Sequence, residues 1–267
     1  MTDFLSGSSG SLASMQAQLR QALDPAAFAR EVLRFPPDPW QERILRTAAS
    51  QVLMCCSRQS GKSTVAAAAA LHTSTFKPGS LVLMVAPTQR QSTELLAKAS
   101  AFIRHIPAAK LDTASSIAIK FNDGGRLISL PGTDPDRIRG FSAPALVVID
   151  EGAFVDDQLY YAIRPMLAVG GGRLLVMSTP RGKRGWFYDA WHYDSESDWH
   201  REKITAYEVP RISPAFLEAE RRRLGDRWFR QEYLCEFISE EDELFDSEDV
   251  QRAINSDIPA LKLVIGL

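Results

Sequence analysis

Four short apolar runs, at 51–56, 80–86, 146–149 and 173–177, punctuate the chain. Each carries few charges, as a strand buried on both faces of a sheet does. Helix-forming segments separate them, including the alanine-rich run from Thr64 to Leu71 and the stretch from Gln91 to Ile106. Strands that alternate with helices predict an α/β fold whose mostly parallel sheet is flanked by helices.

A β-hairpin interrupts this alternation. Residues 116–121 and 126–130 alternate between apolar and polar side chains, and the sequence Asn-Asp-Gly-Gly at 122–125 separates them. Such a turn sequence between two alternating runs is typical of a hairpin.

The first fifty residues are organised differently. Residues 1–14 are rich in serine and glycine, which predicts a flexible tail, and 15–33 read as a helix broken near Asp24-Pro25. A proline-rich turn at 35–39 leads into a short helix from Trp40 to Ala49, with Pro39 at its entrance.

The segment from Cys56 to Ser63, which we call the phosphate loop, closes the first apolar run and opens the alanine-rich helix. It matches G-x-x-x-x-G-K-[ST] with Cys56 at the first glycine, a position that then does not need a positive φ. In a strand–loop–helix context this spacing wraps backbone N–H groups and a helix N-terminus around phosphate. A loop that carries its lysine by chance is the alternative, and the context disfavours it. We therefore expect ATP and Mg²⁺ to bind here, with Ser57, Gln59, Ser60, Gly61, Lys62, Ser63 and Thr64 as nucleotide-binding residues.

Within that loop the side chains have separate tasks. Lys62 is expected to reach the β- and γ-phosphates, and the Ser63 hydroxyl to hold Mg²⁺. Gly61 permits close approach of the backbone because it has no Cβ.

Two adjacent carboxylates, Asp150 and Glu151, end the apolar run at 146–149. In an enzyme with a phosphate loop, the acid at the end of the strand supports Mg²⁺. The next acid is placed to deprotonate the attacking water. We therefore expect Asp150 to be associated with the metal and Glu151 to be the general base, in a fold with an additional strand between the phosphate loop and these acids.

Gln41, upstream of the first strand, is a further candidate. A side-chain amide offers a donor and an acceptor, which suits the edge of adenine. A solvated glutamine on a helix is an equally good interpretation of the residue type.

Composition and net charge limit which classes of protein the chain can belong to. The net charge is −2 and the pI about 6.1, which argues against a surface uniformly basic for nucleic acid but leaves room for a local basic patch. Three cysteines are too few for a disulfide framework and suit a reducing cytoplasm. No apolar run has the length of a membrane span, so no membrane association is expected.

Taken together, these motifs resemble the ATPase portion of the large terminase subunit of tailed bacteriophages, the motor that packages DNA into procapsids. The match runs from about residue 35 to 240 and is carried by Pro39-Trp-Gln41, Ser57-Arg-Gln-Ser-Gly-Lys-Ser63, Ala86-Pro-Thr88, Arg139-Gly140, Val147-Val-Ile-Asp-Glu151, Ser178-Thr-Pro180, Gly185-Trp-Phe-Tyr188 and Phe229-Arg-Gln-Glu-Tyr233. Helicases share single motifs, but the full set is specific.

The resemblance implies further roles. Arg58 would lie near the γ-phosphate and stabilise the transition state, and Ser178-Thr179 would couple hydrolysis to movement. Packaging ATPases work as homo-oligomeric rings completed by a neighbour's arginine, for which Arg104 and Arg139 are candidates. The implied partners are double-stranded DNA, portal protein and the small terminase subunit, in the cytoplasm of an infected bacterium; the isolated chain is expected to be a monomer.

The resemblance also implies the domain organisation. We expect a tail and helix at 1–34, an ATPase core at 35–206, a helical lid at 207–240, and at 241–267 a linker with the truncated start of a nuclease domain. The basic stretch from Glu218 to Arg230 reads either as a solvated helix face or as a surface for DNA or a neighbouring subunit, of which we favour the subunit contact.

Two other functions remain open from the sequence. One is a helicase-like ATPase, although no second phosphate-loop lobe is present in this sequence. The other is a docking module that binds ATP without turnover, which would have no need of a general base beside Asp150.

Overall fold

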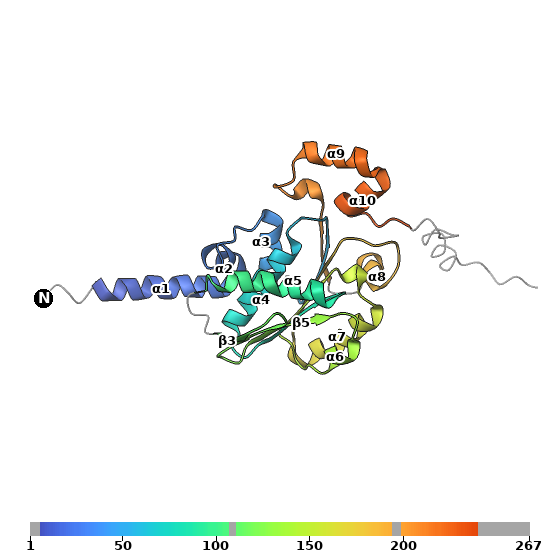
Figure 1. Ribbon diagram of the computed structural model, residues 1–267. Helices are drawn as coiled ribbons and strands as arrows, with labels where there is room; N and C mark the ends of the chain where they lie inside the picture. Colours follow the sequence, from blue (N-terminus) through green and yellow to red (C-terminus); the bar gives the residue numbers. More distant parts are fainter. Residues whose placement is uncertain (1–5, 107–110, 194–198, 240–267) are drawn as a thin grey trace, which may run out of the picture.

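The computed structural model describes residues 6–106, 111–193 and 199–239 of the chain. Within these ranges an eight-stranded sheet has the order β3-β4-β5-β2-β6-β7-β1-β8, with helices above and below it (Figure 1). The strands are β1 (Gln51–Cys56), β2 (Leu81–Ala86), β3 (Leu111–Ala114), β4 (Ala118–Phe121), β5 (Arg126–Pro131), β6 (Leu146–Asp150), β7 (Arg173–Ser178) and β8 (Trp199–Ile204).

The pairing confirms a mostly parallel sheet. The run β5-β2-β6-β7-β1-β8 is parallel throughout, whereas β3, β4 and β5 pair antiparallel at one edge. The hairpin expected around residues 122–125 is therefore present as β4 and β5. In the chain, β2 to β5 lie between the phosphate loop and the acidic pair, as expected, and in the sheet β7 lies between β1 and β6.

Both faces of the sheet are covered, which explains why its central strands are continuously apolar. Val52 and Met54 of β1 pack on one side, in a core shared with α2 (Pro25–Glu31), α3 (Pro39–Arg46), α4 (Lys62–Phe76) and α5 (Gln89–Ile103). Leu53 packs on the other side, in a core shared with α7 (Asp157–Gly170) and α8 (Trp186–His192), and α6 (Pro135–Arg139) adds Ile138 there.

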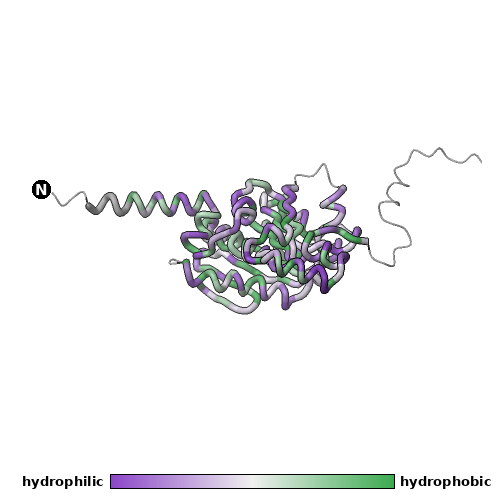
Figure 2. Tube along the Cα trace, turned by 90° about the horizontal axis from the view of Figure 1, so that it is seen from above, coloured by the Kyte–Doolittle hydropathy of each residue, from purple (hydrophilic) through white to green (hydrophobic). Residues whose placement is uncertain are grey.

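The N-terminal segment differs from the sequence prediction. Helix α1 spans Ser6–Leu23, so it begins well before Met15 and includes most of the segment expected to be a flexible tail. It projects away from the body of the molecule (Figures 1 and 2), and Leu12, Met15 and Leu19 on it are exposed. Serine and glycine have low helix propensity, so the sequence pattern does not predict a helix over residues 6–14.

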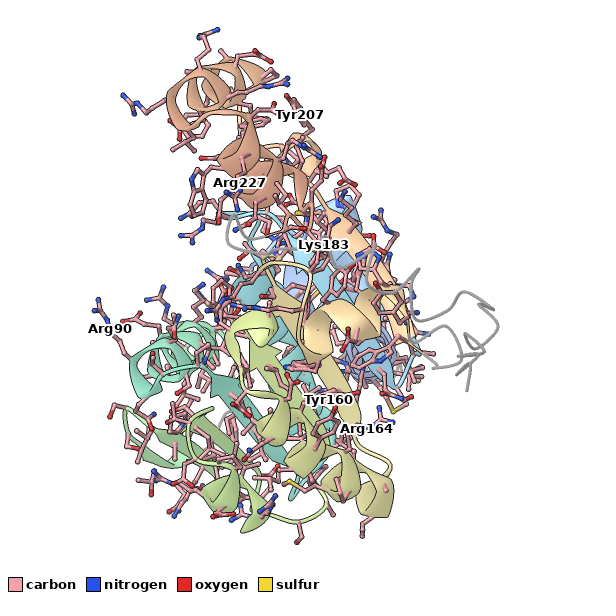
Figure 3. All side chains as sticks on the ribbon, turned by 90° about the vertical axis from the view of Figure 1, so that its right-hand side faces the viewer. Arg90, Tyr160, Arg164, Lys183, Tyr207 and Arg227 are labelled. Carbon is pink, nitrogen blue, oxygen red and sulfur yellow. The ribbon has the colours of Figure 1, made fainter. Side chains whose placement is uncertain are left out.

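The chain beyond β8 forms a small helical subdomain, which we call the lid. It consists of the short 3₁₀ helix η2 (Ala206–Glu208), α9 (Pro214–Leu224) and α10 (Asp226–Leu234), around a core of Ala206, Leu217 and Phe229. Gly225, with φ +79°, separates the two α-helices. The lid stands above the sheet domain, with Tyr207 and Arg227 on it (Figure 3). The expected linker and nuclease start at 241–267 lie outside the described residues.

No helix in the described part of the chain is long and apolar enough to cross a bilayer.

Candidate nucleotide site

The phosphate loop has the geometry that its sequence predicts. Cys56 is the last residue of β1, and α4 begins at Lys62. Gly61, just before the helix, has φ +96°, and a Cβ added there would lie 2.8 Å from Nε2 of Gln41. Only glycine satisfies both constraints without strain. The extended backbone of Cys56 explains why that position does not require glycine.

Lys62 and Glu151 form an ion pair at the centre of the site. Nζ of Lys62 lies 3.1 Å from Oε1 of Glu151. Burial lowers the pKa of Lys62, but the carboxylates of Glu151 and Asp150 outweigh that effect, and the net shift is upward. The ammonium is therefore firmly protonated. Oε2 of Glu151 is buried and has no hydrogen-bond partner among the described residues.

Ser63 and Asp150 form the second polar pair. The Ser63 hydroxyl donates a hydrogen bond of 3.0 Å to Oδ2 of Asp150. Burial raises the pKa of Asp150, while the Lys62 ammonium and the Ser63 hydroxyl oppose that rise. A hydroxyl and a carboxylate are hard oxygen donors, so this pair fits Mg²⁺, which binds proteins through one or two such groups together with phosphate and water.

The turn after β6 links the acidic pair to the end of β7. Glu151 adopts a left-handed conformation, with φ +52°, before the 3₁₀ helix η1 (Gly152–Phe154). The Ala153 N–H donates to Oγ of Ser178, the last residue of β7, at 3.1 Å. Thr179 follows and is also buried. The structure thus brings Ser178, one of the two expected coupling residues, into contact with the turn that holds Glu151.

Gln41 lies against the phosphate loop and is almost fully buried. Its Oε1 accepts a 2.8 Å hydrogen bond from the N–H of Asp38, and its Nε2 donates to the Gly61 carbonyl at 3.4 Å. Arg211, a neighbour of this pair that the sequence did not indicate, donates to the Ser60 carbonyl at 2.9 Å. An arginine in a loop outside any motif gives no sequence signal.

Gln41, Lys62, Ser63, Glu151 and Arg211 are among the residues that line a cavity of about 740 Å³. Most of the predicted nucleotide-binding residues line it, whereas Ser57 lies beneath it and donates from its N–H to the Ile204 carbonyl at 2.8 Å. The lining consists of Phe35, Pro36, Gln41, Arg58, Gln59, Ser60, Gly61, Lys62, Ser63, Thr64, Pro87, Gln91, Lys98, Glu151, Phe154 and Arg211.

The three candidate catalytic arginines have different positions. Arg58 lines the cavity, forms an ion pair with Glu232 of α10, and its N–H donates to the Glu232 carbonyl. Arg139 ends α6 and pairs with Asp136, and Arg104 caps the C-terminus of α5; neither lines the cavity. Within one chain the structure therefore brings Arg58 to the site, but not Arg104 or Arg139.

A phosphate loop before α4, an acidic pair at the end of β6 and a strand between them define a P-loop NTPase fold. The sequence pattern of the family described as terminase large subunit, T4likevirus-type, N-terminal matches residues 53–252. The chain belongs to this family.

Individual relatives agree with this assignment. The large terminase subunit of Thermus virus P23-45 is 26% identical over 265 residues, covering 85% of this chain and 54% of that protein. The large terminase subunit of Escherichia phage T5 is 28% identical over 207 residues, covering 73% of this chain and 46% of the relative. The chain therefore spans about half the length of these relatives.

Solved structures share the fold. The ATPase domain of the Thermus phage P74-26 large terminase superposes with a TM-score of 0.69 at 25% identity, covering 81% of this chain and all of that domain. The HK97 large terminase gives a TM-score of 0.66 at 15% identity, over 81% of this chain and 55% of that one. The large terminase of another thermophilic bacteriophage, in complex with ADP, gives 0.62 at 15% identity, over 76% and 54% of the two chains.

Proposed function

We propose that this chain is the Mg²⁺-dependent ATPase motor of a large terminase, which couples ATP hydrolysis to translocation of double-stranded DNA into procapsids. The observation that carries the proposal is the pairing of Lys62 with Glu151 and of Ser63 with Asp150 at one cavity. Pure binding would require the lysine and the hydroxyl, but not a second carboxylate. A structurally similar terminase from a thermophilic bacteriophage, crystallised with ADP and with ATP-γ-S, supports a nucleotide as ligand.

Each residue of the site has a separate role in the proposed reaction. Lys62 and the N–H groups of the phosphate loop hold the β- and γ-phosphates, and Ser63 with Asp150 holds the metal, which when bound neutralises charge on the phosphate oxygens. Glu151 accepts a proton from the attacking water as the oxygen–phosphorus bond forms. The bond from the γ-phosphorus to the bridging oxygen then breaks, which releases ADP and inorganic phosphate.

Glu151 performs this role only after it leaves Lys62. In the structure Lys62 neutralises one oxygen of the base. An incoming phosphate offers Lys62 a competing anion, so nucleotide binding frees the base where it is needed. The Lys62 side chain is mostly buried, which strengthens its electrostatic interactions.

Two contacts are proposed to transmit the conformational change of hydrolysis from the site to the rest of the chain. Ser178, which precedes Thr179, contacts the turn that carries Glu151 by accepting a hydrogen bond from the Ala153 N–H. Arg58 connects the phosphate loop to Glu232 in the lid, and a γ-phosphate would compete for its guanidinium. Both contacts begin next to groups expected to act on the γ-phosphate, Glu151 in one case and Arg58 in the other.

We further propose that the active form is a homo-oligomeric ring on the portal protein, supplied with DNA by the small terminase subunit in the cytoplasm of the infected bacterium. Arg139 and Arg104 are exposed and away from the chain's own cavity, as a residue acting on a neighbour would be. In the lid, Arg221 and Arg230 already pair with Asp226 and Glu236, which favours a subunit contact over a free DNA-binding face.

Hydrolysis measured against protein concentration tests the ring. We expect the specific rate of the wild type to rise with concentration, and this rise to disappear in Arg139→Ala or in Arg104→Ala. Glu151→Gln provides the inactive baseline. A rate independent of concentration and unaffected by both arginine substitutions would contradict action in trans.

A further inference from the structure

Arg211 reaches the nucleotide cavity from the segment that joins η2 to α9. Its Nη1 lies 2.9 and 2.8 Å from the two carboxylate oxygens of Asp38, and its Nη2 donates to the Ser60 carbonyl at 2.9 Å. The guanidinium lies close to the loop, because a Cβ at Gly61 would come within 3.3 Å of Nη2. One side chain of the lid thus bridges two segments that are distant in sequence.

The bridge closes a ring of contacts around the phosphate loop. Asp38 donates its N–H to Oε1 of Gln41, and Nε2 of Gln41 donates to the Gly61 carbonyl. Arg211 completes the circuit from Asp38 to the Ser60 carbonyl. Gln41 and Arg211 therefore share the same two neighbours, Asp38 and the phosphate loop.

This geometry requires a side chain with two separate nitrogen donors in one plane. The two acceptors, a carboxylate and a backbone carbonyl, are held by different nitrogens of a planar group. A lysine ammonium carries the same charge on one nitrogen and lacks the second planar arm. The Arg211 side chain is about half exposed (53%), so charge alone is screened by solvent and the bridging geometry is the stronger contribution.

We propose that Arg211 is a positioning residue for the nucleotide: it joins the lid to the phosphate loop and to Asp38, the residue whose N–H bonds Gln41, and so holds the cavity in the shape that binds ATP and ADP. The inference rests on the proposed function, since it concerns the same cavity. Arg211 acts on affinity, because its contacts lie on Asp38 and on the Ser60 carbonyl of the loop and not on Glu151 or Asp150.

Affinity for Mg²⁺-ADP, measured by titration calorimetry, tests this with Arg211→Ala, Arg211→Lys and a matched control. The control is Arg46→Ala, because the Arg46 side chain is also about half exposed and also bridges two partners, Asp24 and Glu42, none of which lines the cavity. We expect Arg211→Ala to weaken ADP binding about tenfold, as loss of a charged hydrogen bond does. Arg211→Lys should weaken it nearly as much, and Arg46→Ala should bind as the wild type does.

Kinetics give a second readout. KM for ATP should rise in Arg211→Ala in proportion to the loss of ADP affinity, while kcat stays within about threefold of the wild type. Thermal melting should be no lower in Arg211→Ala than in Arg46→Ala, which separates positioning from general stability. Asp38→Asn retains a residue suited to the start of a helix and should weaken binding in a way that is not additive with Arg211→Ala.

Three outcomes would overturn the inference: wild-type ADP affinity in Arg211→Ala, full rescue by Arg211→Lys, or a fall in kcat without a change in KM. Failure of the proposed function is a distinct result, because the wild-type protein would then not turn over ATP, whatever the ADP affinities of the variants.

Discussion

Nζ of Lys62 lies 3.1 Å from Oε1 of Glu151, so the cation expected to bind phosphate is paired with the expected general base. The pair is largely buried, and the second oxygen of Glu151 has no partner among the described residues. Lys62 therefore occupies one carboxylate oxygen of the residue that we propose as the base. We propose that Glu151 takes up its role only when phosphate competes for Lys62.

Substitution of Lys62 tests the phosphate side of this pair. Lys62→Ala should lose ADP and ATP affinity by at least about tenfold, because the charge-assisted contact to the phosphates disappears. The matched control is Lys77→Ala, at the exposed C-terminal end of the same helix α4. Titration of Mg²⁺-ADP measures both. Equal loss in the two variants would show that the effect is on the helix and not on the site.

Gly61 provides a test of loop geometry. Gly61→Ala places a side chain at φ +96° and 2.8 Å from Nε2 of Gln41. Gly171→Ala, at the C-cap of α7, has φ +58° but nothing within 4 Å of the new Cβ. Both should lose roughly 1–2 kcal/mol of stability from left-handed strain. Only Gly61→Ala should also lose nucleotide affinity; normal affinity there would contradict the close approach at the loop.

His72 on α4 gives the protein a predictable response to acid. Its Nε2–H donates to the Gln21 and Ala22 carbonyls at the end of α1, at 3.1 Å each. Burial lowers the pKa of His72 below 6.5, and those two hydrogen bonds only partly oppose the shift. The unfolded chain then binds more protons than the folded one as the pH falls through 6.5, so stability decreases with acid.

Melting temperatures measured as a function of pH test this prediction. Between about pH 8 and pH 5.5 the wild type should lose stability more steeply than His72→Gln, which retains a side-chain donor but cannot titrate. Parallel curves for the wild type and His72→Gln would contradict the assignment.

The core of the fold could be predicted from the sequence because its signals are local. The apolar runs that became β1, β2, β6 and β7 are buried on both faces, and Gly61 and Lys62 mark the phosphate loop by residue type alone. The acidic pair was recognisable for the same reason, since Asp150 and Glu151 directly follow an apolar strand.

Other features depend on contacts that no local pattern contains. β8 reads Trp-His-Arg-Glu-Lys-Ile, a polar sequence that is a strand because it pairs with β1 at the edge of the sheet. Arg211 belongs to the site through Asp38 and Ser60, which are distant in sequence. The serines and glycines at the start of α1 have low helix propensity, so the sequence does not predict that this helix begins at Ser6.

The central claim is that this cavity hydrolyses ATP with Glu151 as its base. Phosphate release measured with Mg²⁺, at a protein concentration well above that of a dilute assay, tests it in the wild type and in Glu151→Gln. We expect turnover in the wild type, its loss with a metal chelator, and a decrease of about 10²–10⁴-fold in Glu151→Gln with ADP affinity retained. Turnover of Glu151→Gln at the wild-type rate would contradict the account.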